Sequence, residues 1–132
     1  ALRLRVALRA RSAAAGLAGV AGLRDLAGDA GADLVVGGHP HWVQGIEFYD
    51  GKFIAHSLGN YVFDMDFSTE TREGVSLELV FWGSELKAAE LVPVVIGSDF
   101  APRVVTGASA QRILRQMWQV SGLSAASSAA SR

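Results

Sequence analysis

The sequence predicts an α/β fold, and three features of the chain lead to this prediction. The apolar run Leu34–Val36 is bounded by glycines, which is typical of a strand buried on both faces. Before it, leucine and alanine recur at helical spacing; after it, Asp50-Gly51 separates two strand-like runs. Farther on, apolar and polar residues alternate as in antiparallel strands. We therefore expect a layered α/β sandwich with a hairpin and antiparallel strands.

Composition sets bounds on the class of protein. The chain has 132 residues, half of them hydrophobic, which suffices for one domain with a core. Its net charge is −1. The sequence has no concentration of basic residues that would indicate a nucleic-acid partner. The sequence contains no cysteine, which excludes a disulfide framework and a thiolate metal site. No apolar run is long enough to form a transmembrane segment.

The first thirty residues allow two interpretations. Residues 1–15 are rich in alanine and arginine and carry no acidic residue, so they read either as a basic leader or as a strand over Leu4–Leu8. A helix is expected next, starting between Ser12 and Gly16 and ending before Gly31, a good helix stop. Its apolar residues at helical spacing are Leu23, Leu26, Ala27 and Ala30.

Two histidines follow the buried run at a spacing of two, in Gly38-His39-Pro40-His41. Proline biases the preceding residue toward extended geometry, where residues two apart point to the same side. Both imidazoles can then face one point beyond the carboxyl end of a buried strand, where open α/β sheets bind ligands. Neutral imidazole is a common ligand of zinc-like metals. The alternative is a pair of ordinary polar loop residues, because a zinc-type site needs more than two ligands.

The Asp50-Gly51 pair predicts a type I′ turn. That register places Phe48 opposite Phe53 across the two strands. Glu47 should then face away from its neighbours, most simply on a solvated strand face.

The chain beyond residue 60 reads as strands, a loop and a helix. Tyr61–Phe63 is expected as a short strand, and Asp64 and Asp66 after it are either metal ligands or loop residues. The alternating run from Val75 predicts a half-buried strand beside Leu34–Val36. A second strand is expected over residues 86–96, with Pro93 marking an edge or a bulge.

The last part of the chain predicts a loop, a helix and a tail. Residues 98–107 are expected as loop, and Ser109 can cap a helix. The solvent-exposed face of this helix carries Arg112 and Arg115. Residues 121–132 are Ser/Ala-rich and expected to be disordered. The apolar stripe of the helix comprises Ile113, Leu114, Met117 and Trp118.

The stretch from Gly31 to Asp64, GADLVVGGHPHWVQGIEFYDGKFIAHSLGNYVFD, resembles the C-terminal signature of the CapA (PGA_cap) family of bacterial poly-γ-glutamate capsule-biosynthesis proteins. That family in turn resembles calcineurin-like metallophosphoesterases. Gly38–His41 occupies the late Gly-His-x-His motif, and Ser57–Asn60 matches a second family motif. The likeness runs to about Val95 and more loosely to Val120. It implies a partial CapA-like, metallophosphoesterase-type domain over residues 1–120, the C-terminal part of a longer protein.

The resemblance also implies roles for particular residues. His39 and His41 would be metal ligands and, with Asn60, catalytic residues. Asn60 and Arg72 would bind anionic groups of a substrate. The cofactor would be a divalent ion of the Zn, Mn or Fe type, in a site that this chain leaves incomplete. His56 stands where the family more often has tyrosine, so a packing role is expected rather than a metal or substrate contact.

The resemblance finally implies a function in capsule or exopolymer biosynthesis. If the protein is an enzyme, it would be a metal-dependent hydrolase acting on an anionic polymer, a phosphoester or an amide. Capsule synthase subunits would be its partners, and its location would be membrane-associated or extracytoplasmic in bacteria. Two alternatives remain open: a non-catalytic accessory or scaffold subunit of a polymer synthesis or export complex, and a non-functional truncated fragment.

Overall fold

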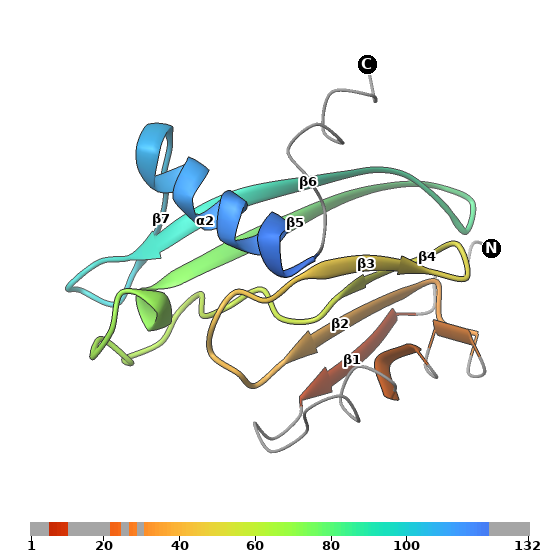
Figure 1. The fold of residues 1–132 in the computed structure, drawn as a ribbon, viewed down its shortest axis with the longest axis horizontal. Helices are drawn as coiled ribbons and strands as arrows, with labels where there is room; N and C mark the ends of the chain where they lie inside the picture. The colour runs from red at the N-terminus through yellow and green to blue at the C-terminus, as the bar shows by residue number, and fades with distance from the viewer. Residues whose placement is uncertain (1–5, 11–21, 25–26, 29–30, 122–132) are drawn as a thin grey trace.

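The computed structural model describes residues 6–10, 22–24, 27–28 and 31–121. Their strands form two sheets, one with the order β1-β2-β4-β3 and one with the order β5-β6-β7, and helix α2 lies beside the strands (Figure 1). None of the helices in the described part of the chain is long and apolar enough to cross a membrane. The elements are β1 (Val6–Ala10), β2 (Leu34–Gly38), β3 (Ile46–Tyr49), β4 (Lys52–Ala55), the 3-10 turn η1 (Glu70–Arg72), β5 (Glu73–Trp82), β6 (Glu85–Ile96), β7 (Pro102–Val104) and α2 (Gly107–Val120).

Strand β2 is a central strand of the first sheet, as the apolar run predicts. It pairs in parallel with β1 on one side and with β4 on the other. Successive residues of a strand point to opposite faces, and here Leu34 and Val35 pack into different core clusters. Within the described residues, the strand interpretation of the N-terminal segment is confirmed, because Val6–Ala10 forms β1. Leu4 and Arg5 lie outside the described residues.

The hairpin β3-β4 forms as predicted. Asp50 has φ 49° and Gly51 has φ 71°, so both central residues take the positive φ that a type I′ turn requires. Phe48 pairs with Phe53, and their rings make an edge contact at 5.3 Å between centroids.

The predicted helix before β2 is only partly described. Residues 22–24 and 27–28 are helical, and the rest of the predicted span lies outside the described residues. Gly31 takes φ 64° and donates its N–H to the Gly28 carbonyl, consistent with a glycine that ends a helix. Leu23 and Ala27 pack with Val35 and Ile54, so this segment covers one face of the first sheet.

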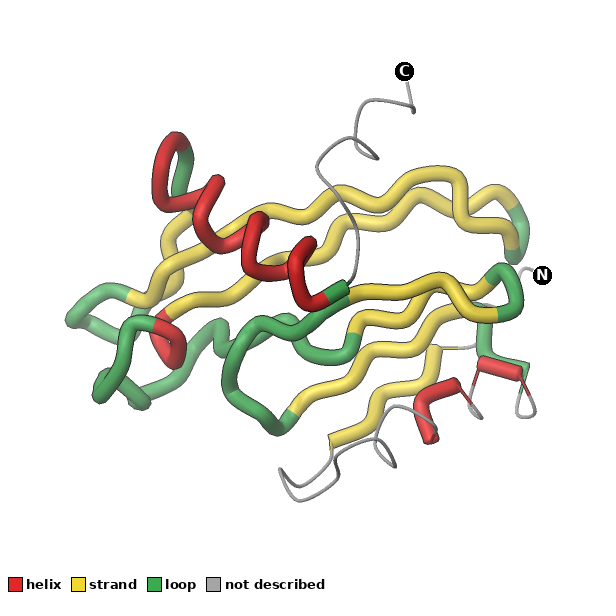
Figure 2. Tube along the Cα trace, viewed as in Figure 1, coloured by secondary structure: helices red, strands yellow, loops and turns green. Residues whose placement is uncertain are grey.

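The strand that starts near Val75 does not lie beside β2, which corrects the prediction. It is part of β5, which pairs with β6 in the second sheet. Val75 instead belongs to the same core cluster as Leu34 and Phe53 of the first sheet. Alternation predicts that a strand is half-buried, but it does not identify the strand's partner. Figure 2 shows β5 and β6 as a long pair of strands, reached from β4 through an extended loop region.

Three further predictions differ from the structure. Tyr61–Phe63 is an exposed non-strand segment, because no neighbouring strand pairs with it among the described residues. Part of the predicted loop 98–107 forms β7, which pairs with the end of β6. Pro93 stays in register opposite Val75, and the irregularity lies between Val80 and Phe81.

Helix α2 contacts β6 of the second sheet and packs its apolar stripe into the core that the two sheets share. It begins at Gly107, and its N-cap is Thr106, three residues before the predicted cap Ser109. Ile113 and Met117 are 1% and 0% exposed and join Leu34 of the first sheet and Val75 of the second in one core cluster, which fixes the helix against the core. The mixed and antiparallel sheets, with α2 beside them, confirm the predicted α/β class.

Ser121, the first residue of the predicted tail, closes helix α2. Its hydroxyl donates to the Met117 carbonyl at 2.6 Å and accepts the Ile46 N–H at 2.8 Å, which ties the end of α2 to β3. Residues 122–132 lie outside the described residues.

Candidate functional site

The two histidines follow β2 directly, but their backbone is not extended as predicted. His39 has φ 92° and His41 has φ 60°, both left-handed values, because the chain turns here from β2 toward β3. Such values are uncommon outside glycine and cost energy, although histidine adopts them more readily than most residues. The two imidazole centroids nevertheless lie 5.9 Å apart, so the turn keeps the rings together.

The His41 ring meets the side chain of Asn60, as the motif order predicts. Its Nδ1 lies 2.8 Å from Asn60 Oδ1, and Asn60 Nδ2 donates to the Thr71 carbonyl at 2.8 Å. A carbonyl only accepts hydrogen bonds, so the amide NH₂ must face Thr71 and the amide oxygen must face His41. His41 therefore donates through Nδ1–H. In the neutral imidazole, Nε2 then keeps its lone pair.

Asn60 is also held through its backbone. Gly59, at φ 74°, forms a bridge with Gly74 at the start of β5. A Cβ at Gly74 would collide with the Asn60 carbonyl oxygen. Close approach of these two segments thus requires glycine at position 74. The close approach leaves Asn60 only 7% exposed.

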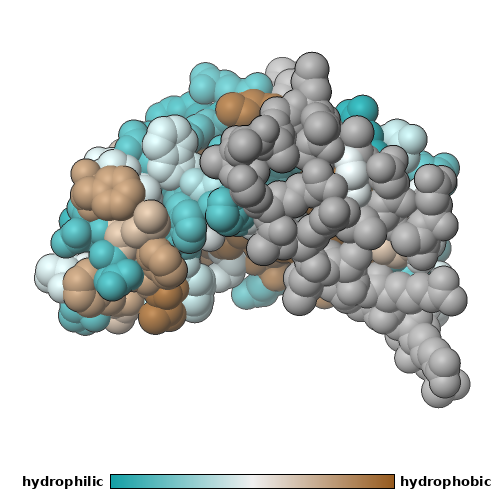
Figure 3. Space-filling view, turned by 90° about the horizontal axis from the view of Figure 1, so that it is seen from below, coloured by the Kyte–Doolittle hydropathy of each residue, from teal (hydrophilic) through white to brown (hydrophobic). Residues whose placement is uncertain are grey.

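One aromatic ring contacts the histidine pair. The His41 ring lies 5.0 Å from the Phe63 ring, centroid to centroid. Figure 3 shows apolar residues gathered at one end of the face seen from below. We call the exposed apolar residues that flank His41 and Asn60 in the sequence the aromatic rim. They are Trp42, Tyr61, Val62, Phe63 and Phe67.

The structure does not bring a complete set of metal ligands together within the residues that it describes. Among these residues, no group of three or more His, Cys, Asp or Glu side chains is arranged to hold a metal ion. Asp64 and Asp66, the two carboxylates that the sequence offers after Phe63, are exposed and form no such group with His39 and His41. Two imidazoles are fewer ligands than a zinc-type site takes.

Arg72 follows Thr71, the residue whose carbonyl contacts Asn60, but its guanidinium contacts the backbone. Nε and Nη2 donate to the Ile96 carbonyl oxygen at 3.0 and 2.9 Å. The predicted role of Arg72 in binding substrate stays a prediction. The bonds seen here join the η1 turn to the end of β6.

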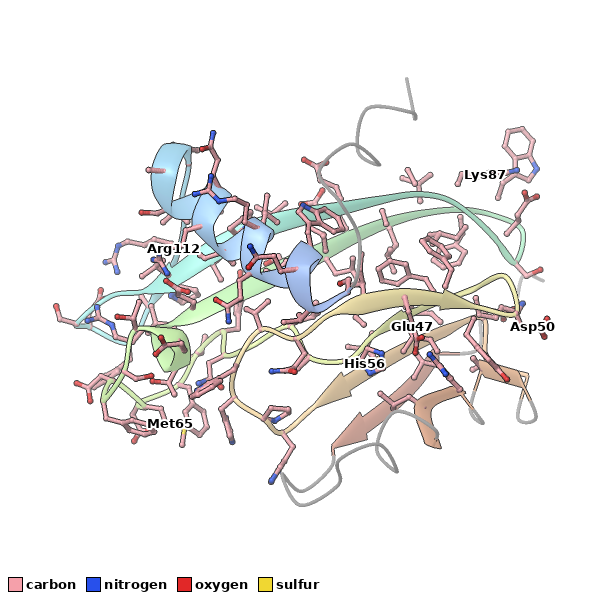
Figure 4. All side chains as sticks on the ribbon, in the orientation of Figure 1. Glu47, Asp50, His56, Met65, Lys87 and Arg112 are labelled. Carbon is pink, nitrogen blue, oxygen red and sulfur yellow. The ribbon has the colours of Figure 1, made fainter. Side chains whose placement is uncertain are left out.

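A second polar cluster, which the sequence does not reveal, joins Arg24, Glu47 and His56. Arg24 Nη2 lies 2.7 Å and His56 Nε2 3.0 Å from carboxylate oxygens of Glu47. Figure 4 shows His56 and Glu47 side by side. The hydrogen bond from Arg24 lowers the pKa of Glu47, and the charge attraction of His56 and Arg24 adds to it. Glu47 faces away from Ile46 as predicted, but it is paired rather than simply solvated. The alternation of β3 indicates its face, whereas nothing in the sequence indicates Arg24, 23 residues away.

Comparison with known proteins finds similarity over part of this chain. Residues 21–65 match the family model for "Bacterial capsule synthesis protein PGA_cap". The chain is 41% identical over 68 residues to "PGA biosynthesis protein CapA" of Bacillus subtilis (strain 168), an alignment that covers 52% of this chain and 18% of that protein. It is 36% identical over 90 residues to "Capsule biosynthesis protein CapA" of Bacillus anthracis, covering 67% of this chain and 21% of that protein.

These matches confirm the predicted resemblance over part of the chain. The chain spans about a fifth of the length of the curated relatives that it matches. His39, His41 and Asn60 lie inside the segment that matches the family model, and Arg72 lies outside it.

Proposed function

We propose that this chain, which carries a segment of the PGA_cap family, is part of a capsule or exopolymer biosynthesis protein, and that His39 and His41 hold a divalent metal ion of the Zn, Mn or Fe type. The names of the two relatives support the biological process. One observation carries the metal proposal. His41 donates Nδ1–H to Asn60, which leaves the Nε2 lone pair for a ligand.

The chemistry of these side chains fits a metal ion. A histidine that binds a metal through one ring nitrogen almost always donates the other N–H to a fixed acceptor, which sets the tautomer and the ring orientation. Asn60 Oδ1 supplies that acceptor at 2.8 Å from His41. His39, exposed and beside His41, supplies a second imidazole. Nitrogen ligands suit Zn and Fe, whereas Mn also takes oxygen ligands, so the other positions would be filled by water, substrate or groups outside the described residues.

If the protein is an enzyme, the reaction would be hydrolysis of a phosphoester or an amide in an anionic polymer or its precursor. A bound divalent ion would polarise the scissile group and activate water at neutral pH. In this reaction His39 and His41 would hold the ion, and Asn60 would orient His41. The aromatic rim would limit access of water. Asn60 has both ends of its amide occupied, which favours an orienting role over direct contact with substrate.

A second candidate is an accessory or scaffold subunit without catalysis. The exposed aromatic rim favours it, because large apolar residues gathered on a surface often mark a contact with another protein. Capsule synthase subunits would be the partners, at or outside the bacterial cell membrane. In this case the segment His39–His41 would be a structural remnant of a metal site.

Calorimetric titration with zinc and with manganese tests the metal site. We expect binding on the order of millimolar, as in a site short of ligands, and its loss in the His39→Ala/His41→Ala double variant. His56→Gln is the matched control, because His56 pairs with Glu47 and belongs to the other polar cluster. Metal binding that survives in the double variant would refute a role of this loop.

A second experiment separates the two functions. It needs the longest available protein that contains these residues, assayed against phosphodiester and amide substrates. Turnover that depends on His39 and His41 favours the hydrolase. Association with purified synthase subunits that depends on the aromatic rim, without any turnover, favours the accessory subunit.

A further inference from the structure

We propose that Arg72 is a positioning residue: it locks the turn whose Thr71 carbonyl orients Asn60, and so determines which nitrogen of His41 faces the site. This inference deepens the proposed function, because the tautomer of His41 matters most if that histidine binds a metal. The arrangement itself is independent of any metal. It gives Arg72 a role that does not require contact with substrate.

The turn that contains Thr71 is built by its own hydrogen bonds. The Thr71 hydroxyl donates to the Ser68 carbonyl at 3.1 Å, and the Thr71 N–H donates to Ser68 Oγ at 3.2 Å. The Arg72 N–H donates to the Thr69 carbonyl at 3.1 Å. Thr71 is 1% exposed, so its carbonyl is presented to Asn60 away from bulk water.

Arg72 fixes this turn to the second sheet. Its Nε and Nη2 both donate to one acceptor, the carbonyl of Ile96 at the end of β6. Two donors from a planar guanidinium fix both the distance and the orientation of the turn. A lysine at this position would offer a flexible point charge without the fork, so it could not reproduce this geometry.

The consequence for Asn60 follows from donor and acceptor chemistry. If the amide flipped, its oxygen would face the Thr71 carbonyl, and two acceptors would oppose each other in a buried place. A turn held in place by Arg72 therefore excludes the flip. Asn60 must then accept from His41, and His41 must carry its hydrogen on Nδ1. If the turn moved away, both amide orientations and both His41 tautomers would become accessible.

The test is the tautomer of His41 in the metal-free protein, read from long-range ¹H–¹⁵N NMR spectra. The spectra are recorded at about pH 8.5, well above the ordinary histidine pKa of about 6.5. We expect the Nδ1–H tautomer of His41 in the wild type. In Arg72→Lys we expect loss of this single signature and the appearance of the Nε2–H form. Arg103→Lys, which changes an exposed arginine paired with Asp99, is the matched control and should keep it.

Two further variants make the result decisive. In Asn60→Ala, the ratio of Nδ1–H to Nε2–H should fall on the order of tenfold, as for loss of one hydrogen bond. Thr71→Val removes the hydroxyl bonds to Ser68 but keeps Arg72, so it loosens the turn from within and should shift the tautomer in the same direction. It decides the matter if Arg72→Lys does not fold.

The proposal is overturned if the wild type shows the Nε2–H tautomer, or if the folded Arg72 and Thr71 variants leave the tautomer unchanged. The metal proposal fails separately. An unchanged heat signal on zinc titration, in a protein whose His41 tautomer responds as expected, would refute metal binding and leave the positioning role of Arg72 in place.

Discussion

Asn60 is the residue on which the candidate site depends. One side chain accepts from His41 and donates to the Thr71 carbonyl, and it can do both in only one orientation. The motif Ser57–Asn60 indicates from the sequence that this asparagine matters. The sequence does not show that its role is to orient a histidine, because Thr71 is a backbone partner 11 residues away.

Replacing Asn60 by alanine should weaken metal binding without removing a ligand. Loss of a group that orients a metal-binding histidine typically lowers metal affinity 10- to 100-fold. Binding that is already weak should then fall below detection in the zinc titration. Gln111→Ala on the exposed side of α2 is the control and should bind like the wild type. Equal affinity of Asn60→Ala and the wild type would contradict an orienting role.

The pair Arg24–Glu47 predicts a dependence of stability on pH. The hydrogen bond from Arg24 lowers the pKa of Glu47 from its ordinary value of 4.5. A carboxyl whose pKa is lower in the folded state stabilises the fold above its ordinary pKa and loses that effect as the pH falls through the folded value. The free energy of unfolding should therefore fall below about pH 4.5 more steeply in the wild type than in Arg24→Gln.

Lys87→Gln is the control for this comparison. It removes a cation from an exposed pair with Glu85 at the β5-β6 turn, so it changes net charge equally and should keep the steep acid slope (Figure 4). If Arg24→Gln and Lys87→Gln lose stability in acid at the same rate, the pairing of Glu47 does not govern this transition.

At the scale of the elements, two adjacent glycines at the end of β2 differ sharply. A Cβ at Gly37 would collide with the His56 carbonyl and press on Leu23, whereas a Cβ at Gly38 would meet nothing within 4 Å. Gly37→Ala should therefore force β2 and the end of β4 apart and lower the free energy of unfolding by about 1–3 kcal/mol. Gly38→Ala should change it by less than about 0.5 kcal/mol. Urea denaturation measures both, and equal losses would show that the strands do not pack this closely.

The elements also show what the sequence can predict. Strand β2, the β3-β4 turn and the apolar stripe of α2 depend on neighbours within a few residues, so apolar spacing and Asp50-Gly51 suffice. The place of β5 depends on β6 and on the core between the sheets, which no local pattern contains. Tyr61–Phe63 has the composition of a strand but finds no partner among the described strands.

The same distinction between local patterns and distant contacts applies to the candidate site. His39, His41 and Asn60 stand in motifs and are found from the sequence. The contacts of Arg72 with Ile96 and of Arg24 with Glu47 bridge 24 and 23 residues, so only the folded chain shows them. The left-handed backbone at His39 was also beyond prediction, because Pro40 favours extended geometry for the residue before it.

At the scale of the whole molecule, the number of metal ligands determines how the protein should respond to metal. The described residues bring together two imidazoles, and among them no larger group of ligands forms. A ligand that binds only the folded state stabilises it by RT ln(1 + [L]/Kd). The melting temperature therefore reports the completeness of the site, because this stabilisation free energy is small for weak binding and large for tight binding.

We expect zinc at about 1 mM to stabilise the 132-residue chain only slightly. With a dissociation constant on the order of 1 mM, the gain is about 0.4 kcal/mol, which corresponds to a rise in melting temperature of about 1–2 °C for a chain of this size. Differential scanning calorimetry with zinc and with a chelator measures the shift, and the His39→Ala/His41→Ala variant should show none. A histidine-dependent rise above about 5 °C would require binding more than tenfold tighter. That result would mean that the chain itself supplies a fuller set of ligands than the two imidazoles that the described residues bring together.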